Sequence, residues 1–341
     1  MAAGGAVATF AATGGVALAR RPIAAPADVD LTTPATRSAV EKGLDYLANR
    51  QGEEGAFGAG GYGKNVGVVG IIATAFLSHG DMPERGRRGR IVSNCLRYVL
   101  SHAKENGFIN AADFAGYGPM YGHGFATLFL AEVYGMAEAR NLRGVLSRAV
   151  KLITQCQSEE GGWRYQPQRR ESDISVTICQ MMALRAARNA GFEVPAETIE
   201  RGLEYIRRCQ NRDGGFMYQL SMLGESEFPR SAGAAAALYG AGLNEGPEID
   251  AALAYLRSAF ESVAKNPAAG HFWYGQYYAA QAWRRAGGDD WAKWYAAISD
   301  VILPLQKADG SWSDEIGPEY ATAMACHFLQ MPASYLPLFQ R

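Results

Sequence analysis

Aromatic side chains gather in the turns of this sequence that precede its most apolar segments. Tyrosine and tryptophan rings bury a large area, and their π faces stabilise cationic carbons. Walls of this kind suit an isoprenoid chain, and they equally suit sugar rings. The aromatic residues that we expect to line a ligand cavity are Tyr121, Trp163, Tyr165, Trp273, Tyr274, Tyr277 and Tyr320.

Two arginines and a histidine occupy the same kind of turn. Arg170 and Arg230 each precede an apolar segment, and His123 lies in a Gly-rich stretch. Guanidinium groups and helix N-terminal amides both attract anions. We therefore expect His123, Arg170 and Arg230 to form an anion-binding rim at the mouth of the cavity. The alternative for His123 is an ordinary residue in a turn that begins a helix.

These turns belong to an internal repeat, which decides the architecture before any local prediction. Each copy has an amphipathic helix that ends near Gln, an acidic and Gly-rich turn, and then an aromatic residue. Four clear copies lie at 42–58, 148–165, 201–218 and 298–314, and two weaker ones at 92–109 and 251–273. The aromatics recur at intervals of roughly 40 to 56 residues, which is typical of two-helix repeats. In this motif Gly permits the tight turn, and Gln can hydrogen-bond unpaired groups at helix ends.

A second segment, poor in charge and rich in Ala, Gly and Thr, follows each copy. A helix that is apolar almost all round must be buried on most sides, whereas a striped helix can face water. The apolar segments are 67–80, 122–136, 172–191, 230–242, 275–287 and 319–331. Six inner helices inside six outer helices predict an all-α fold, a single (α/α)6 toroid over residues 28–341. The inner helices begin at one end of the barrel, where we expect the functional site.

Composition excludes one class of partner. The 341 residues carry 33 Lys+Arg against 34 Asp+Glu, so there is no concentrated positive charge for nucleic-acid binding. The one basic run, in residues 85–90, is predicted to be a solvated loop. The five cysteines are widely spaced without a Cys-x-x-Cys pair, which predicts buried apolar residues. We expect no metal site and no cofactor.

The first residues differ from the rest. Residues 1–27 form a leader with an uncharged Ala/Gly-rich run followed by Arg20 and Arg21. The tripeptides at 17–19 and 25–27 have the small-x-small form that signal peptidases accept, but no basic region precedes the run. An exported or periplasmic protein with a signal segment, and a cytoplasmic protein with a disordered leader, both stay open.

The repeats resemble the QW-type repeats of the terpene cyclase/prenyltransferase superfamily, which contains squalene–hopene cyclases and protein prenyltransferase β-subunits, over residues 36–331. Residues 161–184 are similar to the part of the cyclases that carries an Asp-x-Asp-Asp-Thr acid motif. Asp173 falls on the first Asp, Ser175 on the middle one and Val176 on the last. The middle residue supplies the proton in that family, and a serine hydroxyl is not acidic enough to protonate an alkene. The resemblance leaves Asp173 as the candidate acid, and its alternative is an N-cap of the following helix.

The comparison with prenyltransferases gives one further candidate. The zinc ligands of that family fall on residues 274–276 and on Ala321, and all three are absent, so zinc-activated thiolate chemistry is not expected. His123, with Gly124 and Thr127, resembles the His-Gly-Gly-x-Thr segment in which the His contacts a diphosphate. The resemblance thus implies that His123 acts together with Asp173 as a catalytic residue.

From these patterns we expect a toroid that binds an apolar, isoprenoid-like molecule in an aromatic cavity. Activity as a cyclase or transferase is left open, because both catalytic sets are incomplete. One alternative is a non-catalytic exported toroid that binds a ligand or a protein; a membrane surface is a further open partner. Another is a glycan-active α/α-barrel enzyme, which would need two carboxylates about 5 to 10 Å apart. Its candidate carboxylates are Asp113, Asp173, Glu225, Glu227, Asp314 and Glu319.

Overall fold

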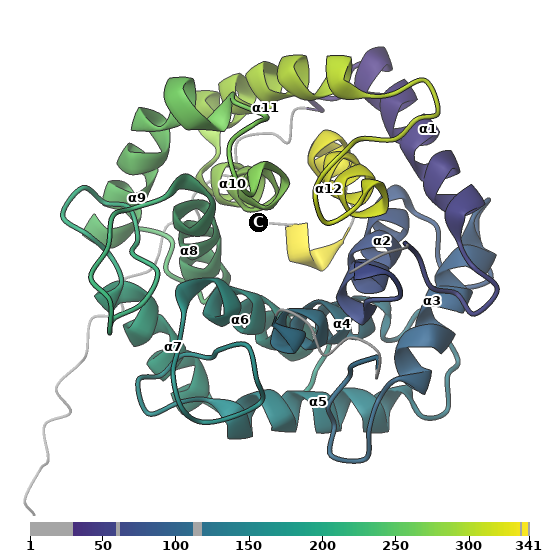
Figure 1. The fold of residues 1–341 in the computed structure, drawn as a ribbon, viewed down its shortest axis with the longest axis horizontal. Coiled ribbons are helices and arrows are strands. Elements are labelled where there is room, and N and C mark those ends of the chain that lie inside the picture. Colours follow the sequence, from purple (N-terminus) through teal and green to yellow (C-terminus); the bar gives the residue numbers. More distant parts are fainter. Residues whose placement is uncertain (1–29, 59–61, 112–117, 335, 340–341) are drawn as a thin grey trace, which may run out of the picture.

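The computed structural model describes residues 30–58, 62–111, 118–334 and 336–339, so the predicted leader lies outside the described part. In this part the regular structure is helical, and the helices alternate between an outer and an inner layer (Figure 1). The outer helices are α1 (Pro34–Arg50), α3 (Gly89–Ser101), α5 (Leu142–Cys156), α7 (Ala196–Arg208), α9 (Pro247–Ser258) and α11 (Gly288–Ile302). The inner helices are α2 (Val66–His79), α4 (Pro119–Val133), α6 (Ile174–Asn189), α8 (Phe228–Gly240), α10 (Phe272–Ala286) and α12 (Pro318–Gln330).

The inner helices form a closed ring. Each packs against the inner helix before and after it, and α12 packs against both α2 and α1. The view down the barrel axis shows the outer helices surrounding this ring (Figure 1). The structure therefore confirms the predicted all-α (α/α)6 toroid.

Burial follows the pattern that the sequence predicts. In α2 every residue except His79 is buried, whereas α7 buries one face and exposes its charged residues. Small side chains let the inner helices approach closely: a Cβ on Gly67 would lie 2.8 Å from the Cα of Gly122 in α4. In the described ranges, no helix has the length and apolar character needed to cross a membrane.

The repeated Gln joins successive outer helices. Nε2 of Gln157 donates to the carbonyl of Gly161 in its own turn (2.7 Å) and to that of Thr198 in α7 (2.9 Å). Nε2 of Gln306 makes the equivalent bond to Ala39 in α1, which closes the outer layer (2.8 Å). The predicted role of this Gln at helix ends is thus confirmed.

The Gly and Trp of the motif have structural roles in the same turn. Gly161 has a φ of +100°, and a Cβ there would lie 2.3 Å from the carbonyl oxygen of Arg201, so only glycine fits. Trp163 is buried, and its indole Nε1 donates to the carbonyl of Ile153 at the end of α5 (2.7 Å). Each turn is therefore fixed to the helix before it and to the helix after it.

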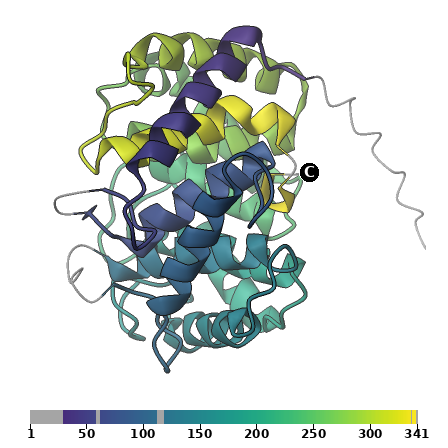
Figure 2. The same ribbon diagram turned by 90° about the vertical axis from the view of Figure 1, so that its right-hand side faces the viewer.

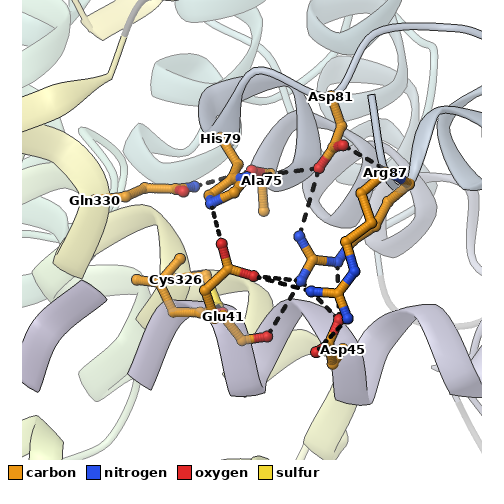
Figure 3. Close-up of polar contacts among 10 residues, drawn as sticks. Glu41, Asp45, Ala75, His79, Asp81, Arg87, Cys326 and Gln330 are labelled. Atoms are coloured by element: carbon orange, nitrogen blue, oxygen red, sulfur yellow. Dashed lines mark hydrogen bonds and ion pairs between the residues drawn. The ribbon is translucent and has the colours of Figure 1, made fainter. Parts of the chain in front are cut away.

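A network of ion pairs joins α1 to the loop between α2 and α3 (Figure 3). The guanidinium of Arg88, only 4% exposed, lies 2.6 Å from carboxylate oxygens of both Glu41 and Asp45. His79, at the end of α2, lies 2.9 Å from Glu41. The prediction of a solvated loop for the basic run is therefore wrong at Arg88, because three carboxylates surround it; Arg87 is exposed as expected.

The chain after α12 turns back into the ring. It forms two short 3-10 helices, η4 (Met331–Ala333) and η5 (Pro337–Phe339). Because η5 contacts α6, which lies across the inner ring from α12, this segment spans the central hole. Figure 1 shows it inside the ring, and Figure 2 shows the C-terminal end of the chain at one end of the barrel.

Candidate functional site

A cavity of about 580 Å³ opens at the end of the barrel where the inner helices begin. All six inner helices contribute to it from their first turns or from the residues just before them. Its most frequent side chain is tyrosine, and we call it the tyrosine cavity. The tyrosines that line it are Tyr62, Tyr121, Tyr165, Tyr218, Tyr274 and Tyr320.

The tyrosines supply ring faces and uncharged hydroxyl groups. The hydroxyls of Tyr165 and Tyr218 are 2.5 Å apart and share a hydrogen bond. The ring of Tyr121 lies 6.2 Å from that of Tyr165. The hydroxyl of Tyr274 is buried beside the side chain of Ser175 without a hydrogen bond of normal geometry, and burial raises its pKa well above the ordinary value. A ligand can therefore meet aromatic surface and at least one tyrosine hydroxyl in the same cavity.

The charges at the mouth of the cavity are already paired. Of the described lining residues, Glu227 and Arg230 carry permanent charge, and their side chains are 2.7 Å apart. The guanidinium of Arg230 also donates to the backbone carbonyls of Phe216 (2.8 Å) and Glu225. Arg230 thus lines the cavity as predicted, but each of its three side-chain nitrogens already has a partner in the protein.

Asp173 caps α6 beside the cavity. Its Oδ1 accepts a hydrogen bond from the N–H of Val176 (2.9 Å), as the N-cap alternative predicts. Its Oδ2 is buried and has no hydrogen-bond partner. Burial raises the pKa of this carboxyl to about 6, although the Val176 bond and the charge of Arg164 act in the opposite direction. Asp173 is absent from the cavity lining, whereas Ser175 belongs to it.

His123 faces away from the cavity. It is fully buried, its Nδ1 accepts from the N–H of Ile109 (3.2 Å), and its ring lies 5.6 Å from that of Phe108. Burial lowers its pKa to about 4. It therefore packs against the segment that follows α3, and the expectation that it shares a cavity with Asp173 and forms a rim with the two arginines is not met.

The remaining predicted residues divide into two groups. Those that line the cavity are Tyr121, Tyr165, Tyr274 and Tyr320. Of the others, Trp163 and Trp273 use their indole N–H groups to bind backbone carbonyls, that of Ser313 in the case of Trp273 (2.9 Å). Arg170 is exposed outside the lining, and Tyr277 lies behind the lining residue Phe125. Buried aromatics that hold turns in place resemble lining aromatics in the sequence.

Several lining residues were not among those predicted. Asn65 and His271 directly precede α2 and α10, and Tyr62 lies in the turn before α2. Their position before an inner helix was the available signal. Asn65 and His271 do not stand out by residue type, because they belong to no cluster of aromatic residues or arginines in the sequence.

The cysteines have no role in this site. All five are free and buried, which confirms the prediction from their spacing, and burial raises the pKa of Cys179 beside α4. Within the described residues, no group of His, Cys, Asp and Glu side chains is arranged to hold a metal ion.

Residues 71–259 match the family described as Prenyltransferase alpha-alpha toroid domain, which is more than half of the chain. The chain belongs to this family. In this chain, the matched residues run from within α2 to the end of α9. A comparison with curated proteins found no match.

Solved structures share this fold across differing activities. A type II terpene cyclase from Scytonema, in complex with geranylgeranyl dihydroxybenzoate, is 13% identical, with a TM-score of 0.63 over 89% of this chain and 98% of that chain. A cellobiose 2-epimerase from Bacillus thermoamylovorans is 13% identical, with a TM-score of 0.65 over 87% and 98%. An inactive variant of an alpha-1,6-mannanase from Salegentibacter, in complex with mannotriose, is 10% identical, with a TM-score of 0.63 over 87% and 99%. At these identities the likeness concerns the fold alone.

Proposed function

We propose that this prenyltransferase toroid binds an uncharged, apolar molecule of isoprenoid type in the tyrosine cavity. The observation that carries the proposal is the combination of six tyrosine rings with the aliphatic side chains of Val68, Ile71 and Ile316 around one cavity. A volume of about 580 Å³ lies within the range of small-molecule pockets. Burial of aromatic and aliphatic surface would supply the affinity.

The charge of the ligand follows from the state of Arg230. An anionic head group needs a cation whose charge is available, and each nitrogen of Arg230 already has a partner, Glu227 or one of two backbone carbonyls. An uncharged alcohol needs only a hydrogen-bond partner, which the hydroxyl of Tyr274 provides. These contacts favour a prenyl alcohol or hydrocarbon over a prenyl diphosphate.

Any turnover would depend on Asp173. Ser175 lines the cavity at the position where the resemblance to cyclases expects the proton donor, and a hydroxyl is too weak an acid for that step. Asp173 is two residues away, with a pKa of about 6 and an unpartnered oxygen. If the protein converts an isoprenoid to a product and the Asp173→Asn variant does not, the protein is a catalyst as well as a binding protein.

Glycan hydrolysis is less well supported. It needs two carboxylates that flank the bond. Among the described lining residues Glu227 is the carboxylate, and it is paired with Arg230. Sugar rings nevertheless stack on tyrosine, so an oligosaccharide belongs in the test.

The experiment is isothermal titration of the protein with geranylgeraniol, an uncharged isoprenoid alcohol, and with mannotriose. We expect saturable binding of the alcohol that weakens about tenfold in Tyr274→Ala. The matched control is Tyr134→Ala, because Tyr134 lies at the other end of α4 and packs on Phe192. Binding of mannotriose alone, lost in Tyr274→Ala, would overturn the isoprenoid proposal in favour of a glycan-binding toroid.

A further inference from the structure

The tyrosine cavity ends at a layered floor. Phe125 and Ile71 are lining residues of α4 and α2. Beneath them, the ring of Tyr277 in α10 packs edge-on against Phe125 at 6.4 Å between centroids. Nε2 of His327 in α12 lies 2.9 Å from the carbonyl oxygen of Ile71. Tyr277 and His327 also contact each other, with centroids 5.5 Å apart.

The C-terminal segment forms the next layer of this floor. The ring of Phe339 lies 6.1 Å from that of Tyr277 and 5.5 Å from that of His327. Leu338 and Phe339 are both buried. The η5 segment thus lies directly behind Tyr277 and His327, which contact the lining residues Phe125 and Ile71.

Polar contacts hold the segment in this position. Arg284 of α10 donates to the carbonyl of Met331, where the segment begins. The N–H of Leu338 donates to the buried carboxyl group of Glu132 in α4. Together with the contact between η5 and α6, these bonds link the segment to inner helices on both sides of the hole. An isolated three-residue helix would have no stable position without such contacts.

We propose that Phe339, acting through Tyr277, sets the length of the isoprenoid chain that the tyrosine cavity accepts. The proposal rests on the proposed function and adds a specificity-determining residue to it. Phe339 lies outside the cavity lining; it packs against Tyr277, which in turn supports the lining residue Phe125. A smaller residue at 339 would leave space into which the Tyr277 ring, and behind it the Phe125 ring, can move, and the cavity would deepen.

The test uses three prenols of increasing length: farnesol, geranylgeraniol and solanesol. In the wild-type protein we expect affinity to increase from farnesol to geranylgeraniol and to fall sharply for solanesol. Phe339→Ala should bind solanesol at least about tenfold more tightly than the wild type, while farnesol affinity changes by less than about twofold. Tyr277→Ala should shift the length limit in the same direction.

The controls separate this inference from the proposed function. Phe192→Ala makes the same change at a partly buried ring away from the floor and should leave the length limit unchanged. Thermal melts establish that each variant is folded, and Phe339→Leu provides a milder change if Phe339→Ala is not. If the wild type binds no prenol, the proposed function fails; if it binds prenols and the folded variants keep the same length limit, the inference about Phe339 alone is overturned.

Discussion

The ion-pair network around Arg88 and the tyrosine cavity treat polar groups in opposite ways. In this Arg88 network, the buried guanidinium lies among Glu41, Asp45 and Asp81, the three carboxylates labelled in Figure 3. In the cavity, Glu227 and Arg230 of the described lining residues form one ion pair, and the tyrosine hydroxyls, with Asn65, Ser175 and His271, supply the other polar groups. Charge therefore serves to hold α1 against the following repeat, whereas the cavity presents a nearly neutral surface to its ligand.

The pKa values of the carboxyl groups express the same difference. In the Arg88 network, burial alone would raise the pKa of Asp81, but the hydrogen bonds of His79 and of the Arg88 N–H, together with the charge of Arg88, lower it overall. Beside the cavity, burial outweighs the favourable contacts of Asp173 and raises its pKa to about 6. A carboxylate is tolerated in a buried place when a cation is provided, and it tends toward the neutral acid when none is.

The largest effect on stability is expected from a variant that breaks the Arg88 network. Arg88→Ala leaves three carboxylates without their shared cation, and we expect the free energy of unfolding to fall by about 3 kcal/mol. Arg87→Ala, at a neighbouring side chain that is 69% exposed, should cost about 0.5 kcal/mol. Urea denaturation measures both. Equal losses in the two variants would contradict the distinction between a buried and a solvated arginine.

A second variant tests a buried carboxyl group, that of Glu132, whose charge is not balanced by a close ion pair within the described part of the chain. Burial raises the pKa of Glu132 to about 7, so between pH 4.5 and 7 the folded protein holds a proton that the unfolded chain has released. Wild-type stability therefore falls through this window, and Glu132→Gln should be more stable by about 2 kcal/mol at pH 8. Near pH 4 the two proteins should differ little. Melts at both pH values measure this, and a variant that is less stable at pH 8 would contradict it.

A third variant sharpens the neutrality of the cavity. Glu227→Gln removes the negative partner of Arg230 and leaves its two carbonyl bonds in place. Affinity for geranylgeranyl diphosphate should then rise about fivefold, while affinity for geranylgeraniol stays the same. Titration with both ligands measures the ratio. An unchanged ratio would mean that Arg230 does not control which head group is accepted.

The smallest effect on stability is expected from His79 in the Arg88 network. A hydrogen bond to Asp81 and the nearby carboxylates raise the pKa of His79, although burial opposes them. Its contribution is fully present below its unfolded pKa, near 6.5, and is lost as pH rises through the higher folded value. Relative to the wild type, His79→Gln should lose less than about 1 kcal/mol at pH 6 and almost nothing at pH 9. The difference between the two urea curves at each pH measures this, and a difference that grows with pH would have the wrong sign.

The fold could be predicted from the sequence because its signal is repeated. The Gln, Gly and aromatic positions recur with the same contacts, as the bonds of Gln157 and Gln306 show. An error in one copy does not change the pattern. The end of the barrel that holds the cavity followed from the same reasoning, because every inner helix begins there.

Individual site residues were harder to predict because their role depends on side-chain direction. Trp163 and Tyr165 are two positions apart, yet the first binds a backbone carbonyl and the second lines the cavity. His123 has the same spacing to Gly124 and Thr127 as in the prenyltransferase segment that it resembles, but its ring packs against Phe108 instead of facing the cavity. Phe339 gave no signal in the sequence, because nothing there indicates that the chain end returns to the hole.

The most direct test of a neutral, apolar ligand site is the affinity of the wild-type protein for geranylgeraniol compared with geranylgeranyl diphosphate, titrated in one buffer. The two ligands share their chain and differ in the charge of the head group. We predict that the alcohol binds at least about tenfold more tightly, because Arg230 is already neutralised by Glu227. Tighter binding of the diphosphate, or no binding of either ligand, would contradict the assignment.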